Sequence, residues 1–266
     1  MPTTVSDGLV LGGLAGWNAG EIVASVADCT TGPVGGGEGL PTTAGLVGIN
    51  RGLTDEDSDQ SRATISLSFA LGTVRYGLNC GGLVGTNDGG IRTSFSRAPI
   101  EAEQAFSARS NVGGIAGRNR GTVERSFAAG RIDADGSERA GALVGSHRSG
   151  TIAECYWDRS ATTREAGIGH SVMGGEVVGG YETDQLQGAS AAETMAAFDF
   201  ENTWTTVTDP DDYPTLAWTE VENAPDYDAW TDDDALPGFG LLTTAIAIGG
   251  VAYVVGRRFG TASTRS

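Results

Sequence analysis

The chain has 266 residues, with 42 Gly, 34 acidic residues and 17 Lys and Arg, all of which are Arg. The formal net charge of −17 excludes nucleic acid as a partner, because contacts to phosphate require clustered basic side chains. An acidic excess without Lys is typical of proteins that stay hydrated in concentrated salt, where the Debye length is about 3 Å at 1 M and carboxylates barely repel one another. We therefore expect a halophilic source, with an ordinary acidic surface as the alternative.

A glycine-rich phrase recurs five times between residues 12 and 158, at intervals of 32, 37, 32 and 28 residues. Regular self-similarity at this period is typical of stacked repeats. Each copy is anchored by an apolar residue, at Leu14, Leu46, Leu83, Ile115 and Leu143. A Gly follows two residues later, at Gly16, Gly48, Gly85, Gly117 and Gly145. An Asn follows two residues after that Gly, at Asn18, Asn50, Asn87 and Asn119, and the fifth copy has His147 instead.

The second half of each copy carries a small residue followed by a large one. The small residues are Ser25, Ser68, Ser94, Ser126 and Cys155. The large residues are Val26, Phe69, Phe95, Phe127 and Tyr156. If the strand alternated strictly across this segment, Arg125 and Glu154 would point into the core, so we expect a bend or bulge there.

These repeats predict an all-β fold, a right-handed parallel β-solenoid of about five coils over residues 1–158. Like positions then stack, so that the anchor residues form an apolar column and Asn side chains pass hydrogen bonds from coil to coil. Glycines at the corners would permit positive φ and let the backbone bend without a Cβ clash. Stacking at about 4.8 Å also pairs opposite charges between coils. These are Asp88 with Arg51 and Arg120, and Arg92 with Glu124.

The recurring Gly-Leu-x-Gly-x-Asn-x-Gly core resembles the GLUG repeat, which is found in bacterial and archaeal surface proteins and beside the catalytic domains of some IgA-cleaving metallopeptidases. The resemblance covers about residues 12 to 158. The fifth copy departs from it at Ala142 and His147 and by one inserted residue before Gly150. The resemblance implies that the chain belongs to a surface protein.

The pattern changes after residue 158. We expect residues 159–218 to begin as a Gly-rich loop and to continue as a small aromatic α/β cap over the exposed last coil. Ser190, with Glu193 three residues later, predicts the start of a short helix in this cap. An acidic linker over residues 219–236 follows.

Residues 239–256 carry no charge, and as a helix these eighteen residues would span about 27 Å, close to the thickness of a bilayer's hydrocarbon core. We expect one transmembrane helix within residues 237–258, with a buried core helix as the alternative. Arg257 and Arg258 follow the apolar run. The positive-inside rule therefore places them and the tail, residues 259–266, in the cytoplasm and the repeats outside the cell.

Pro237, Gly238 and Phe239, together with the apolar run and the Arg pair, resemble the PGF-CTERM signal of archaeal surface proteins. In that family an archaeosortase recognises the tripeptide, removes the helix and leaves the protein attached to a lipid. The resemblance implies an archaeosortase as partner and attachment to the membrane through the helix or a lipid that replaces it. The linker departs from the family because it is acidic and poor in Thr.

The segment that begins at Met1 has neither a basic n-region nor an apolar h-region, so it contains no secretory signal. The first coil begins almost at once. We therefore expect a fragment or a mis-assigned start, with further coils encoded upstream.

Few residues point to catalysis or metal binding. Any His-dependent triad would need His147 or His170, and the segment "GHSVMG" lacks the second Gly of a nucleophile elbow. Asp55, Asp57 and Asp59 alternate as in a calcium loop, but the later Gly and the bidentate Glu are missing. We predict no cofactor and no metal site.

The three cysteines form neither a disulfide framework nor a metal site. Cys29 and Cys80 fall near the ends of successive coils and could form one disulfide. Cys155 occupies the column of small residues, where packing explains it.

Two classes of function stay open. We favour a non-catalytic structural, adhesion or recognition module on the outer face of a halophilic archaeal cell, anchored through its C-terminus, with an S-layer or a surface glycan as partner. The alternative is a polysaccharide-active β-helix enzyme, or an accessory repeat region of a surface hydrolase, in which carboxylates from neighbouring coils meet on one face. The sequence does not name a ligand.

Overall fold

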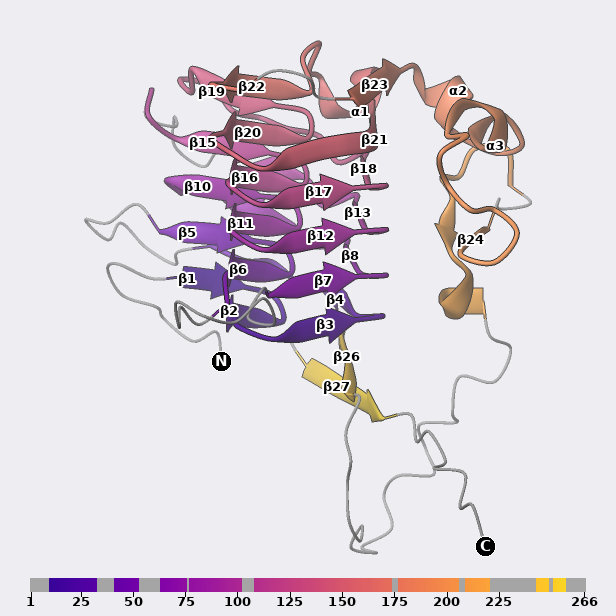
Figure 1. The fold of residues 1–266 in the computed structure, drawn as a ribbon, viewed down its shortest axis with the longest axis horizontal. Coiled ribbons are helices and arrows are strands. Elements are labelled where there is room, and N and C mark those ends of the chain that lie inside the picture. Colours follow the sequence, from indigo (N-terminus) through magenta and orange to yellow (C-terminus); the bar gives the residue numbers. More distant parts are fainter. Residues whose placement is uncertain are drawn as a thin grey trace, which may run out of the picture.

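The computed structural model shows a stack of parallel coils (Figure 1). Each coil gives strands to three sheets, which we call A, B and C. The architecture is mostly β with few helices, consistent with the predicted β-solenoid. The residues that the structure describes are 10–32, 41–52, 63–75, 77–101, 108–173, 177–205, 209–220, 243–248 and 251–256.

Sheets A and B take one strand from each coil, and every neighbouring pair of strands is parallel. Sheet A runs in the order β1 (Val10–Gly12), β5 (Thr42–Ala44), β10 (Asn79–Gly81), β15 (Asn111–Gly113) and β19 (Arg139–Gly141). Sheet B runs in the order β2 (Ala15–Asn18), β6 (Val47–Asn50), β11 (Val84–Asn87), β16 (Ala116–Asn119), β20 (Val144–His147) and β22 (Ile168–Ser171).

Sheet C contains two rows of short strands, which the long strand β21 (Thr151–Asp158) joins by pairing with both. The first row is β3 (Glu21–Val23), β7 (Thr64–Ser66), β12 (Gly90–Arg92) and β17 (Thr122–Glu124). The second row is β4 (Val26–Asp28), β8 (Phe69–Ala70), β13 (Phe95–Ser96) and β18 (Phe127–Ala128). Two further short strands, β9 (Val74–Arg75) and β14 (Ile100–Glu101), pair in parallel beside the stack.

The interior is a column of the anchor residues. Leu46, Leu83, Ile115 and Leu143 are 0% exposed and belong to one hydrophobic cluster. Their backbones are linked from coil to coil, since the N–H of Leu46 donates to the carbonyl of Leu83 at 3.0 Å, and the N–H of Ile115 donates to Leu143 at 2.8 Å. Leu14, in the first coil, packs on the same cluster but is only partly buried. The anchor residues therefore stack along one axis, as expected.

The expected bend lies between the two rows of sheet C. The residue before each small residue has a positive φ between 46° and 55°, in the left-handed region. In each coil, this conformation turns the large side chain that follows away from the interior. It also leaves the side chains of Arg125 and Glu154 about half exposed. The five residues are Ala24, Leu67, Thr93, Arg125 and Glu154.

Residues 159–182 were expected to form a Gly-rich loop, but the described part of this segment contains a short helix and two more strands. They are α1 (Arg159–Thr162), β22 in sheet B and β23 (Val177–Tyr181), which pairs with β21. The glycines serve packing, because a Cβ at Gly167 or Gly180 would meet the ring of Trp157 within 3 Å. A sixth, partial coil therefore follows the five that the repeats predict.

The aromatic cap lies along the side of the stack rather than over its end. Phe69, Phe95 and Phe127 stack at 4.5 and 4.9 Å between ring centroids, and Trp204 and Trp218 of the cap pack on them. This outward aromatic column presents a continuous apolar surface, which the cap converts into a second core. The cap comprises α2 (Thr183–Leu186), α3 (Ser190–Thr194), β24 (Trp204–Thr205), β25 (Thr215–Leu216) and the 3₁₀ helix η1 (Ala217–Glu220). The helix expected from Ser190 is thus present but short, and its N-cap is Ala189.

The described residues of the C-terminal apolar run form two paired strands instead of the expected helix. Strands β26 (Thr243–Ile248) and β27 (Val251–Gly256) pair antiparallel, and β26 pairs in parallel with β4. The sequence gives a physical reason. Gly249 and Gly250 lie between two runs that contain β-branched residues, and a Gly-Gly pair in that setting is a hairpin signal. Among the described residues, no helix is long and apolar enough to cross a membrane.

Candidate functional site

The Asn column forms a continuous ladder of side-chain amides. Asn18 donates to Asn50 at 2.9 Å, Asn50 to Asn87 at 2.8 Å, and Asn87 to Asn119 at 2.7 Å, in each case from Nδ2 to Oδ1. The last three are 0% exposed. The N–H of Gly89 donates to Oδ1 of Asn87, which fixes the orientation of that amide. Every amide therefore points its donor toward the next coil.

His147 ends the ladder. Its Nδ1 lies 3.1 Å from Nδ2 of Asn119. Oδ1 of Asn119 already accepts from Asn87 and from the N–H of Gly121, so its Nδ2 must be the atom that faces the ring. Nδ1 of His147 is consequently the acceptor of this bond. The ring is 1% exposed, and its role here is the ladder position that Asn holds in the other coils.

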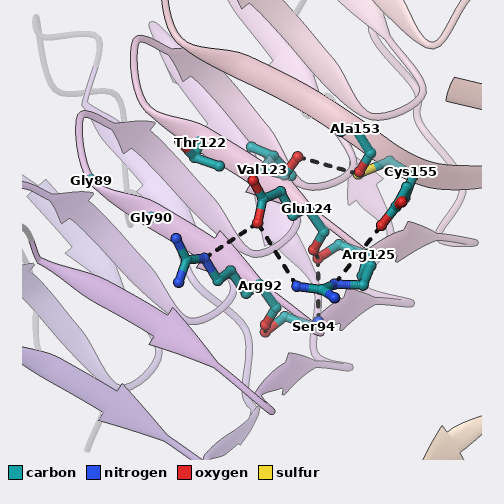
Figure 2. Close-up of polar contacts among 12 residues, drawn as sticks. Gly89, Gly90, Arg92, Ser94, Thr122, Val123, Glu124, Arg125, Ala153 and Cys155 are labelled. Atoms are coloured by element: carbon teal, nitrogen blue, oxygen red, sulfur yellow. Dashed lines mark hydrogen bonds and ion pairs between the residues drawn. The ribbon is translucent and has the colours of Figure 1, made fainter. Parts of the chain in front are cut away.

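A second ladder runs through the small residues of sheet C. The hydroxyl of Ser94 donates to the carbonyl of Arg92 at 2.8 Å and accepts the backbone N–H of Ser68 at 3.2 Å. The N–H of Ser94 in turn donates to the hydroxyl of Ser126, and Figure 2 shows this part of the ladder. The hydroxyl therefore satisfies backbone groups that the left-handed bend removes from the strand pairing. Cys155 takes the same place in the fifth coil, donating from Sγ to Ala153 at 3.2 Å.

We expect the Ser94→Ala variant to lose about 2 kcal/mol of free energy of unfolding, because the buried N–H of Ser68 loses its acceptor. Cys155→Ser is the matched control. It restores the hydroxyl of the other coils and should change the free energy of unfolding by less than about 1 kcal/mol. Chemical denaturation in molar salt measures both, and equal losses in the two variants would contradict the role given to this ladder.

Opposite charges alternate along the outer corner, as the repeats predict. Asp88 lies between Arg51, whose Nε donates to it at 2.6 Å, and Arg120, whose Nη1 is 3.3 Å away. The side chain of Asp88 is only 13% exposed, so this group is partly shielded from the screening of salt. The corner therefore holds adjacent coils together through charge as well as backbone pairing.

A second charged group lies on the face of sheet C (Figure 2). Glu124 contacts Arg92 at 3.4 Å and Arg125 at 4.0 Å, and Arg125 also contacts Glu154 at 4.0 Å. Each carboxylate in this group has an Arg beside it. Arg125 contacts both Glu124 and Glu154. Glycoside hydrolysis instead uses two carboxylates that flank the bond to be cleaved.

The column Gly16, Gly48, Gly85, Gly117 and Gly145 lies within the strands of sheet B rather than at corners, and the expectation of positive φ at these glycines is wrong. Their physical role is close packing. A Cβ at Gly117 would lie 2.7 Å from the backbone nitrogen of Cys80 and 2.8 Å from the carbonyl oxygen of Gly85. Sheet B therefore approaches the backbone of sheet A so closely that no side chain fits.

The three cysteines are free thiols in the structure, so the disulfide proposed between Cys29 and Cys80 is not formed. Cys80 is 0% exposed and belongs to the interior cluster with Val112. Burial raises the pKa of the Cys80 thiol and raises that of Cys155 to about 12. Burial and the neighbouring Asp28 raise the pKa of Cys29. All three thiols therefore stay protonated and unreactive at neutral pH.

The remaining predicted residues do not gather into a site. His170 and Ser171 are neighbours on β22, and Ser171 donates to the carbonyl of Met173 at 2.9 Å. In the part of the chain that the structure describes, no three metal-binding side chains come together. Outside the described residues lie Asp55, Asp57 and Asp59, and the sorting-signal residues Pro237, Gly238, Phe239, Arg257 and Arg258.

A buried hydrogen bond joins the stack to the cap. Tyr213 donates its hydroxyl to Oδ2 of Asp158 at 2.6 Å, and Asp158 is 0% exposed. The other oxygen of Asp158 accepts the N–H of Ala161 and caps α1. Beside it, Arg97 lies 5.3 Å from the Tyr213 ring and pairs with Asp212 at 2.9 Å. This junction holds the cap in place.

We expect Tyr213→Phe to lower the free energy of unfolding by about 2 kcal/mol, because a buried carboxylate loses its donor. Burial and the hydrogen bond to Asp158 raise the pKa of Tyr213 in the folded chain above its usual value of about 10. This contribution to stability is therefore complete below about pH 10 and is lost as the pH rises further. Denaturation of the wild-type and Tyr213→Phe proteins from pH 7 upward measures this contribution. If the difference in their free energies of unfolding stayed constant above pH 10, it would contradict the role given to the Tyr213 hydroxyl.

Comparison with known proteins finds one local similarity. The chain is 32% identical over 76 residues to Halomucin of Haloquadratum walsbyi (strain DSM 16790 / HBSQ001), which covers 27% of this chain and 1% of that protein. The chain therefore matches only a small part of the length of this relative. No protein-family model and no solved structure matches the chain.

Proposed function

We propose that the chain is a non-catalytic structural and recognition module of a halophilic cell surface, anchored through its C-terminus. The single observation that carries this proposal is that the polar side chains of the coils are committed to one another. The Asn ladder, the Ser ladder and the Arg51–Asp88–Arg120 group each link one coil to the next. They stiffen the stack along its axis, as a structural module requires.

The similarity to Halomucin of Haloquadratum walsbyi supports a cell-surface role in concentrated salt. The net charge of −17 and the absence of Lys support the same environment. Surface charges are screened at molar salt, whereas the backbone ladders are not, so a stack of this kind keeps its shape there.

Attachment to the membrane is the second part of the proposal. In the structure, β26 of this segment pairs with β4 and with β27, and this strand pairing satisfies its backbone groups in water. In a bilayer the same segment satisfies its backbone groups internally as a helix. The resemblance to the PGF-CTERM signal then gives the route of attachment, by archaeosortase cleavage after export and transfer to a lipid.

Expression of the full chain in a halophilic archaeal host tests the anchor. We expect the chain in the membrane fraction, with the repeats open to protease on intact cells. Gly238→Ala alters the tripeptide and should release the chain from lipid attachment. Recovery of the chain in the cytosol would overturn the proposed location.

A second experiment tests the non-catalytic role. Purified chain is incubated in molar NaCl with isolated cell envelopes and with their polysaccharides. We expect sedimentation of the chain with the envelopes and no release of new reducing ends. Turnover of any polysaccharide would replace this proposal by the enzyme alternative.

A further inference from the structure

The charge pairing of the outer corner stops at the fifth coil. Arg51, Asp88 and Arg120 alternate in sign along this corner. Arg148 is the next member, because it and Arg120 each donate their N–H to the carbonyl of the ladder residue in the preceding coil. Two cations therefore occupy neighbouring places, one strand spacing of about 4.8 Å apart, where the earlier coils set a cation against a carboxylate.

A neighbouring column on sheet B carries further hydrogen-bond donors. The register of β16, β20 and β22, the last three strands of this sheet, aligns Arg118 with Ser146 and Ser146 with His170 (Figure 1). Arg118 and His170 are partly exposed, so this column faces solvent. Arg118 and Ser146 each lie two residues before a member of the corner column. The two columns are therefore adjacent on the last coils.

Two polar atoms in these columns are buried without a partner. Among the described residues, the hydroxyl of Ser146 and Nε of Arg148 are shielded from solvent and form no hydrogen bond. Ser146 is 0% exposed, and it is a short side chain between two longer ones. A buried donor without an acceptor is costly, and an acceptor supplied from outside the chain would recover that cost. The last coils thus hold donors that the fold itself does not use.

Acidic side chains are missing from the same surface. The chain has a net charge of −17, yet the three stretches that form this surface contain neither Asp nor Glu. These stretches are residues 116–123, 144–152 and 168–173. Within the described part of the chain, Arg118 and Arg148 form no ion pair, whereas Arg92 and Arg97 each contact a carboxylate. The last coils therefore present uncompensated positive charge on an otherwise acidic molecule.

We propose that this surface binds the carboxylate or sulfate groups of an acidic polysaccharide, through Arg118, Ser146 and Arg148. Guanidinium groups bind such oxyanions through two parallel N–H···O bonds. Molar salt screens distant charges far more than partly buried contacts, so these direct bonds persist there. Rotation of the flexible Arg118 side chain toward the ligand uncovers the Ser146 hydroxyl, which then donates to the same group.

A polymer fits this surface better than a free anion. Both columns run along the stack, with donors repeated at the strand spacing of about 4.8 Å. A chain of charged sugars contacts several donors at once, and each further contact forms at a high effective concentration. A free anion contacts one or two donors and competes with chloride. The inference gives a ligand class to the recognition role proposed above, and it rests on that role only for the origin of the polysaccharide.

Titration calorimetry of the full chain in molar NaCl tests the proposal. The probes are alginate, which is a polyuronate, dextran sulfate and neutral dextran. We expect a polyanion to bind and neutral dextran not to bind. Binding of alginate alone identifies carboxylates as the ligand groups, and binding of dextran sulfate alone identifies sulfates. The Arg118→Gln/Arg148→Gln double variant should weaken binding by about tenfold or more, because each Arg loses its charge-assisted bonds.

Ser146→Ala separates binding from stability. Its hydroxyl has no partner in the free chain, so its removal should leave the free energy of unfolding unchanged or raise it, while binding weakens. Arg131→Gln is the matched control for charge. Arg131 is an exposed Arg that follows sheet C in the fourth coil and forms no ion pair among the described residues. This variant should bind as the wild type does.

Equal weakening by Arg131→Gln and by the double variant would overturn the proposed site. Glucuronate that bound as tightly as alginate would overturn the polymer as ligand. Failure of both alginate and dextran sulfate to bind would overturn the whole inference. In that case, sedimentation of the chain with cell envelopes would still support the proposed function, so the two proposals fail separately.

Discussion

The Gly117→Ala variant is expected to lose more than about 3 kcal/mol of free energy of unfolding. The added methyl group would lie 2.7 to 2.8 Å from backbone atoms of Cys80 and Gly85, in two different strands of the preceding coil. Backbone held by pairing on both sides cannot rotate away as a side chain can, so the cost exceeds the 1 to 3 kcal/mol of ordinary overpacking. Chemical denaturation monitored by circular dichroism measures the loss.

Gly90→Ala is the control for this prediction. Gly90 is also buried in the middle of the stack, but a Cβ there would meet only the methyl group of Thr64, at 3.6 Å. Neither Gly90 nor Gly117 has a positive φ, so the two variants differ in space alone. Similar losses in both variants would show that the glycines act through conformational freedom instead of close packing.

Asn87→Ala should cost about 3 kcal/mol in free energy of unfolding, because the buried N–H of Gly89 and the partly buried carbonyl of Thr122 each lose a partner. The side chain also leaves a cavity between the amides of Asn50 and Asn119, which adds to the loss. The measurement is again the free energy of unfolding in molar salt.

Asn18→Ala provides the comparison within the same ladder. Asn18 lies in the first coil, where its neighbours are partly exposed and water can replace the lost bonds. We expect a loss of about 1 kcal/mol there. Equal losses of free energy of unfolding in the Asn18→Ala and Asn87→Ala variants would show that burial is not what makes the ladder bonds stabilising.

The stacking could be predicted because the same residue types recur at equivalent positions. The column of Leu46, Leu83 and Ile115, and the contacts of Arg51 and Arg120 with Asp88, follow from the parallel register alone. Alternation of residues in a strand also required the bend near residues 125 and 154, because charged side chains do not enter a core. These features depend on local spacing, which a sequence displays directly.

Features that depend on contacts distant in sequence could not be predicted. Trp218 donates its indole N–H to the carbonyl of Leu67, 151 residues away, and so draws the cap along the flank. Tyr213 and Asp158 are 55 residues apart, and no local spacing pairs them. The cap was expected over the last coil because an open end needs cover, but the aromatic column offers it a longer apolar surface.

The C-terminal segment carries two conflicting sequence signals. Its apolar length predicts a membrane helix, whereas Gly249 and Gly250 between β-branched runs predict a hairpin. The structure pairs β26 with β27, in agreement with the second signal.

Distances between pairs of nitroxide labels test the stacking of the coils most directly. Trp17, Arg118 and His170 occupy one register column of sheet B. Arg118 lies three strand spacings from Trp17, and His170 lies five strand spacings from Trp17. With labelled chain diluted in unlabelled chain, we predict about 14 Å from position 17 to 118 and about 24 Å from 17 to 170, before allowance for the labels. Distances that do not grow in the ratio of three to five would contradict a single stack of coils.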